Sequence, residues 1–62
     1  MNFRRQARRF IDRQVEVDTV NETYVGRLAK VEYDVILLCI CHKGQNHLII
    51  IRIDEIVALS AV

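Results

Sequence analysis

The run Val35–Cys41 is apolar at every position, and this feature constrains the fold more than any other. Successive side chains of a β-strand point to opposite faces, so such a strand needs cover on both of them. A second run, Leu48–Ile51, has the same character. A chain of 62 residues forms one domain at most, and it buries only about 60% of the surface that its unfolded form exposes. We therefore expect neighbouring copies of the chain to cover part of these strands.

The remaining pattern predicts one helix followed by five short strands. Phe3, Ala7, Phe10 and Ile11 share one face of a helix, and Asn2 is a suitable N-cap. Aliphatic residues dominate the rest of the chain, which has no proline or tryptophan, and this composition favours strands. The expected elements are a helix at about 3–12 and strands at about 14–20, 23–31, 35–41, 47–53 and 56–59.

Tight connections join these strands. Asn21-Glu22 predicts a short hairpin turn in which Asn tolerates a positive φ, and residues 42–46 predict a polar loop around a glycine. Gly26 lies inside the second strand, where it predicts a bulge or sharp bend. We therefore expect a mainly β protein: residues 1–62 form a single domain with an N-terminal helix and a strongly bent, five-stranded antiparallel barrel of the SH3-like type.

Charge is distributed unevenly along the chain. The formal net charge is +1, yet residues 1–13 hold five arginines against one aspartate, whereas residues 14–62 hold four basic and seven acidic side chains. A basic head is therefore joined to an acidic body. Such a helix can bind phosphates, although a solvated helix face and a helix lying on an anionic membrane are alternatives. The arginines of the head are Arg4, Arg5, Arg8, Arg9 and Arg13.

The two cysteines, Cys39 and Cys41, lie two residues apart on one predicted strand. Their Cα atoms would be about 6.6 Å apart, at the outer edge of disulfide geometry. We expect buried, reduced thiols that fill the core, as is usual in the cytoplasm. With His42 and His47 they make only a thin case for a metal, because zinc sites typically use Cys-x-x-Cys spacing. We predict no metal and no cofactor.

The sequence offers no catalytic constellation. Ser60 is its only serine and lies close to the end of the chain, and there is no glycine-rich phosphate loop. The acidic residues Glu16, Asp18, Asp54 and Glu55 are typical of exposed faces rather than of paired catalytic carboxylates. No apolar run approaches the roughly 18 residues that cross a membrane. We therefore expect a cytoplasmic protein that is not an enzyme and has no membrane partner.

Two motifs resemble the Sm-like superfamily, in particular its Hfq-like bacterial RNA chaperones. The run from Gly26-x-Leu28 through Val35-Ile36-Leu37-Leu38 is similar to the first Sm motif, with an acidic, aromatic corner at 32–34. The tail Ile51-Arg52-Ile53-Asp54-Glu55-Ile56 is similar to the second, and it also resembles small Sm-like proteins of spore-forming bacteria. The resemblance covers residues 3–59.

This resemblance implies a homo-oligomeric ring of about five to seven subunits that binds single-stranded RNA. Its inner surface would include Glu32, Tyr33 and Arg52, and the arginines of the helix would form a rim patch. Tyr33 could stack on a base or stay a turn residue, and Arg52 could contact RNA or form a salt bridge with Asp54, Glu55 or Glu32. The subunit interface would use the last two strands, with Leu48, Ile49, Ile50, Ile51, Ile56, Val57 and Leu59.

Three residues depart from the superfamily pattern and define an alternative function. Leu37 stands near the place of a base-holding asparagine, Asp34 occupies the place of a stacking phenylalanine, and Ile53 replaces a glycine. The Lys-His pair of the bacterial chaperone is also absent before Ile56. These changes favour an Sm-like ring that acts as a structural or protein-interaction module and has lost the nucleotide pocket.

Overall fold

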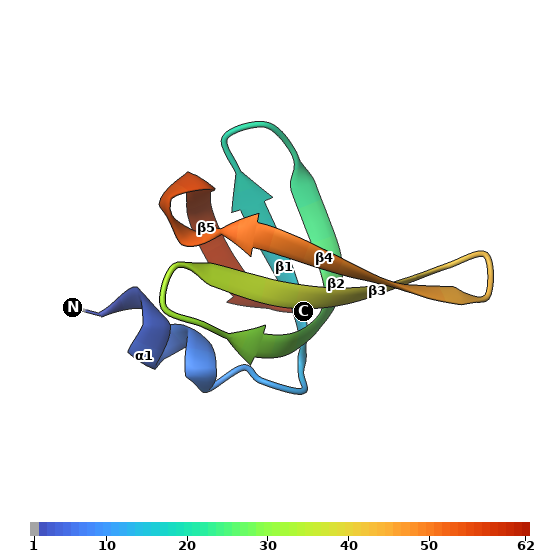
Figure 1. The fold of residues 1–62 in the computed structure, drawn as a ribbon, viewed down its shortest axis with the longest axis horizontal. Coiled ribbons are helices and arrows are strands. Elements are labelled where there is room, and N and C mark those ends of the chain that lie inside the picture. Colours follow the sequence, from blue (N-terminus) through green and yellow to red (C-terminus); the bar gives the residue numbers. More distant parts are fainter. Residues whose placement is uncertain (1) are drawn as a thin grey trace.

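The computed structural model describes residues 2–62. One short helix precedes a five-stranded antiparallel sheet, so the protein is mainly β (Figure 1). The elements are α1 (Phe3–Arg8), β1 (Gln14–Thr19), β2 (Thr23–Val31), β3 (Val35–His42), β4 (Gln45–Arg52), the 3₁₀ helix η1 (Ile53–Glu55) and β5 (Ile56–Ala61).

Helix α1 begins where the sequence predicts and ends four residues earlier. The Asn2 side chain accepts hydrogen bonds from the backbone N–H groups of Arg4 and Arg5, at 2.9 and 3.4 Å. Ala7 is buried in the core. The helix stops at Arg8 because the chain must turn into β1: Asp12 adopts a positive φ of 71°, and its N–H donates to the carbonyl of Leu28 at 2.7 Å.

The sheet has the strand order β4-β3-β2-β1-β5 and is open, so the predicted closed barrel is wrong on this point. Among residues 2–62, β4 and β5 each pair with one strand only and form the two edges. The 3₁₀ helix η1 carries the chain from the β4 edge to the β5 edge. Both edges still reach the same core, with Ile49 and Ile51 from β4 and Ile56 and Leu59 from β5.

Strand β2 links the two halves of the sheet. It pairs with β1 through Thr23–Arg27 and with β3 through Arg27–Val31. The irregularity in pairing lies between Leu28 and Lys30, so the predicted bulge at Gly26 is displaced toward Ala29. Gly26 instead allows close approach: a Cβ there would lie 2.7 Å from the carbonyl oxygen of Cys39 and 2.9 Å from a side-chain carbon of Ile40.

The two hairpin turns differ from their predictions. In the β1–β2 turn, the Thr19 hydroxyl donates to the Glu22 carbonyl at 2.7 Å and accepts from the Glu22 N–H at 3.0 Å, and Asn21 has no positive φ. Positive φ occurs instead at Lys43 (54°) and Gly44 (76°), which alone form the β3–β4 turn. The predicted loop at 42–46 is therefore mostly strand, and this hairpin extends away from the body (Figure 1).

The two faces of β3 and β4 differ in burial. Ile36, Leu38 and Ile51 point into the core. On the other face Leu48 and Ile50 are 60% and 64% exposed, so within one chain β4 is not covered on both faces. The same face carries the thiols.

Cys39 is half-buried and Cys41 exposed, and both are free. Their prediction as buried core residues is wrong, because the inward positions of β3 belong to the aliphatic residues Ile36, Leu38 and Ile40. No helix among residues 2–62 is long and apolar enough to cross a membrane.

Candidate nucleic-acid interface

A hollow of about 260 Å³ lies where the β2–β3 turn meets the end of β4 and η1. The backbone holds this corner together, because the Ile53 N–H donates to the Asp34 carbonyl at 2.9 Å and the Glu32 N–H donates to the Val35 carbonyl at 2.8 Å. Two residues that the sequence predicts as RNA contacts therefore face one space. The lining residues are Tyr33, Asp34, Arg52, Ile53 and Asp54.

Tyr33 is 81% exposed and has one partner from the helix. The guanidinium of Arg4 lies 4.4 Å from the centre of the Tyr33 ring, and its Nη1 donates to the Tyr33 carbonyl at 3.4 Å. An arginine above a tyrosine face makes a cation–π contact worth about 0.5–1 kcal/mol at an exposed site. Arg4 does not line the hollow, so the guanidinium leaves that space open.

Arg52 forms the local ion pair that was one of its two predicted alternatives. Its Nη2 lies 2.9 Å from Oδ2 of Asp54. Both side chains are about two-thirds exposed, so the pair contributes little to stability, and a ligand phosphate or base can compete for the guanidinium. Glu32 is paired with Lys30 at 3.2 Å and does not line the hollow, so the structure separates it from Tyr33 and Arg52.

Carboxylates give the corner a mixed electrostatic character. Asp54 is neutralised by Arg52, whereas the Asp34 carboxylate has no hydrogen-bond or ion-pair partner among residues 2–62. An ionised carboxylate is an acceptor only, so Asp34 presents two acceptor oxygens beside an exposed aromatic ring. A ligand of this hollow must therefore bring hydrogen-bond donors as well as an aromatic surface.

The basic helix lies next to this corner. Arg5, Arg8 and Arg9 are exposed and form no salt bridge with any residue in 2–62. Arg13 lies over the Phe10 ring, with 5.8 Å between the guanidinium carbon and the ring centre. Through Arg4, the helix and the hollow form one surface, which we call the basic corner (Arg4, Arg5, Arg8, Arg9, Tyr33, Asp34, Arg52). Sequence reasoning missed this link, because nothing local joins Arg4 to a tyrosine 29 positions away.

The predicted interface residues fall into three groups. Leu48, Ile50 and Val57 are well exposed on the edge strands. Ile49, Ile56 and Leu59 are half-buried against the core. Ile51 is only 4% exposed and belongs to the core, so it offers almost no surface to a neighbour.

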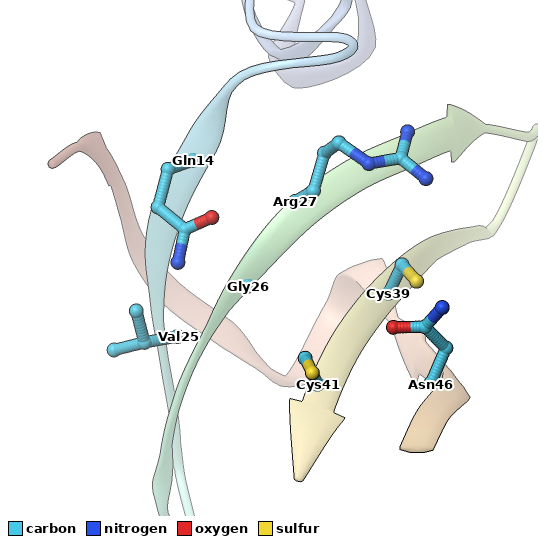
Figure 2. A pocket seen from close by; sticks show the side chains of 7 residues that line it. All are labelled: Gln14, Val25, Gly26, Arg27, Cys39, Cys41 and Asn46. Atoms are coloured by element: carbon cyan, nitrogen blue, oxygen red, sulfur yellow. The ribbon is translucent and has the colours of Figure 1, made fainter. Parts of the chain in front are cut away.

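A second hollow, of about 360 Å³, lies on the outer face of the sheet (Figure 2). Figure 2 shows Cys39 and Cys41 on β3 and Asn46 on β4. Gln14 on β1 and Val25 and Arg27 on β2 line the other side of the hollow. Arg27 is the only charged lining residue, and it is paired with Asp12 at 3.2 Å. In the sequence, only the alternation of the two cysteines pointed to this hollow. Apart from Arg27, its lining residues are uncharged. Within residues 2–62 no three His, Cys, Asp or Glu side chains come together to hold a metal ion.

No protein-family model matches the chain, and no curated protein or solved structure matches it. The resemblance to the Sm-like superfamily thus stays a prediction made from residues 3–59.

Proposed function

We propose that the protein is an Sm-like, homo-oligomeric ring that binds single-stranded RNA at the basic corner. The observation that carries this proposal is the hollow itself, which combines the exposed Tyr33 ring with Arg52 and lies beside an arginine-rich helix. Single-stranded RNA offers unstacked bases and a phosphate backbone, and this surface has a group for each.

Each part of the corner has a physical role in binding. A base stacks on Tyr33, and such stacking is worth about 1–3 kcal/mol per base. Arg52 exchanges its exposed pairing with Asp54 for a base or phosphate contact. The guanidiniums of Arg5, Arg8 and Arg9, which form no salt bridge within residues 2–62, neutralise backbone phosphates and release counterions.

The open edges of the sheet support the ring. Strand β4 exposes a free edge together with Leu48 and Ile50, and β5 exposes the other free edge together with Val57. Pairing β4 of one subunit with β5 of the next satisfies both backbone edges and covers these side chains. Repetition of this heterologous contact closes a ring when the rotation permits. The ring repeats a weak site in every subunit, so avidity supplies the affinity. We place it in the reducing cytoplasm, where its free thiols would persist.

Fluorescence anisotropy with labelled single-stranded RNA tests the proposal. Arg8→Glu should weaken binding at least about five-fold and lower the slope of log affinity against log salt by about one. Lys43→Glu makes the same charge change at the hairpin tip, far from the corner, and should bind as the wild type does. A protein that binds no RNA at low salt, or equal losses for both variants, would overturn the proposal.

An alternative is a ring that serves only as a structural or protein-interaction module. The Asp34 and Asp54 carboxylates in the hollow favour it, because they repel phosphates. In that case the purified protein shows a ring mass by light scattering and an absorbance ratio free of nucleic acid, and no RNA binds.

A further inference from the structure

We infer that the hollow at the basic corner selects guanine, and that Asp34 reads the base. This inference rests on the proposed function, since it names which base of a bound RNA enters the hollow. It follows from the pattern of donors and acceptors that line the space, which differs in kind from a neutral amide-lined pocket.

The charged side chains of the hollow present one donor group, Arg52, and one acceptor group that is not already paired within residues 2–62, Asp34. Arg52 carries N–H donors, and its present partner, Asp54, is exposed and easily exchanged. Asp34 carries two acceptor oxygens without a partner among residues 2–62. The bond from the Ile53 N–H holds the Asp34 backbone at this corner, and Asp34 lines the hollow together with Tyr33.

Only guanine among the four RNA bases has two adjacent donors on its Watson–Crick edge, N1–H and the N2 amine. A carboxylate accepts both at once in a planar, two-bond arrangement, and its charge strengthens both bonds. The neighbouring O6 of guanine is an acceptor, which suits a guanidinium such as that of Arg52. The base is thus complementary to the hollow at three atoms.

The other bases each place an acceptor against the carboxylate. Uracil has carbonyl oxygens on both sides of its single N3–H, adenine has its N1 lone pair beside the amine, and cytosine has N3 and O2 beside its amine. An acceptor that faces the exposed Asp34 carboxylate repels it, and neither group gains a hydrogen bond from the other. Discrimination therefore arises from rejection of the wrong edge as well as from attraction of the right one.

The arginines of α1 favour guanine within RNA over a free guanine nucleotide. Arg5 and Arg8 lie on α1 and Arg9 is its C-cap, and none of the three lines the hollow. We therefore expect them to reach phosphates of neighbouring nucleotides rather than the phosphate of the bound one. A free nucleotide keeps the base contacts and loses the backbone contacts.

The test compares hexameric RNAs that differ at one position. We expect UUUGUU to bind the wild-type protein at least about five-fold more tightly than UUUUUU, UUUAUU or UUUCUU, the lower limit of what one bidentate base contact supplies. Inosine in place of guanine deletes only the N2 amine, and UUUIUU should lose most of this preference. Guanosine monophosphate should compete only at concentrations far above those of UUUGUU.

Asp34→Asn keeps the size of the side chain and removes the second acceptor. This variant should bind UUUGUU and UUUUUU equally, while the matched control Glu22→Gln in the β1–β2 turn should keep the wild-type preference. Equal binding of guanine and inosine, or a preference that survives in Asp34→Asn, overturns the inference. Guanosine monophosphate that binds as tightly as UUUGUU overturns its RNA part.

Failure of this inference differs from failure of the proposed function. RNA that binds without a guanine preference leaves the RNA-binding proposal standing and removes Asp34 from base selection. Absence of binding to all four hexamers removes both.

Discussion

Aliphatic side chains lie on both faces of strands β3 and β4, but they are buried on one face and exposed on the other. Leu38 and Ile51 on the inner face are almost fully buried, whereas Leu48 and Ile50 on the outer face are mostly exposed. The difference is not chemical, since all four are aliphatic. Burial depends on which face of the sheet packs against the core. Within one chain only the inner face is covered, and the ring that we propose would cover the outer face.

The largest expected effect tests the inner face. Leu38→Ala leaves a cavity in the core and should lower the free energy of unfolding by about 3 kcal/mol. Leu48→Ala removes the same atoms from the outer face, and it should change the unfolding free energy of an isolated subunit by less than about 0.5 kcal/mol. Urea denaturation at low protein concentration measures both. Similar losses for the two variants would contradict the assignment of the faces.

A smaller loss of unfolding free energy is expected from a substitution at Gly26, where β2 lies close to β3. Gly26→Ala places a methyl group 2.7 Å from the Cys39 carbonyl oxygen, so the strands must shift. We expect a loss of about 1–2 kcal/mol, since overpacking typically costs about 1–3 and the change to alanine recovers part of that. The neighbouring Val25→Ala on the outer face serves as control and should have little effect. A thermal midpoint of Gly26→Ala equal to that of the wild type would show that the approach is looser than the structure has it.

The outer face is tested by charge rather than by volume. Ile50→Lys leaves the core intact, so the circular dichroism spectrum and unfolding of the subunit should change little. It should nevertheless reduce a ring to single subunits in light scattering, because a buried ammonium at the β4 edge has no partner. Val20→Lys, at a valine that is also exposed but lies in the β1–β2 turn, should keep the assembled mass. A wild-type protein that stays a soluble single subunit at micromolar concentration would contradict the neighbour that we expect on this face.

The smallest effect concerns the polar part of the outer face. The pair Arg27–Asp12 at 3.2 Å is exposed, so its coupling should be below about 0.5 kcal/mol. A double-mutant cycle with Arg27→Ala and Asp12→Asn measures this coupling, and asparagine tolerates the positive φ at position 12. A coupling above about 1 kcal/mol would mean that the outer face is more shielded from water than one chain can explain.

The burial of strands β1 and β3 also shows how much of the fold the sequence can predict. In β1, valines alternate with charged residues, so Val15 and Val17 could be assigned to the core in advance. In β3 every position is apolar, so the pattern predicts a strand but does not say which face is inside. The exposure of Cys39 and Cys41 follows from that ambiguity.

The ends of elements and the contacts of the site were harder to predict. The helix stops short because Asp12 turns through a positive φ, and this choice depends on a hydrogen bond to β2 rather than on local propensity. The resemblance to Sm-like motifs places Tyr33 and Arg52 on one predicted surface, and both line one hollow in the structure. The Arg4–Tyr33 contact has no local signal in the sequence. The sequence singled out Asp34 only as a departure from the superfamily pattern, and in the structure its carboxylate has no partner among residues 2–62.

The long β3–β4 hairpin has a practical consequence. Residues 41–46 are all exposed and the core cluster ends at Ile40 and Ile49, so the tip is held by its own ladder and its two-residue turn alone. An insertion at such a tip should be tolerated without disturbing the packed core. An epitope or a fluorophore-bearing loop inserted between Lys43 and Gly44 would label the protein far from the basic corner, so that the label does not obstruct that surface.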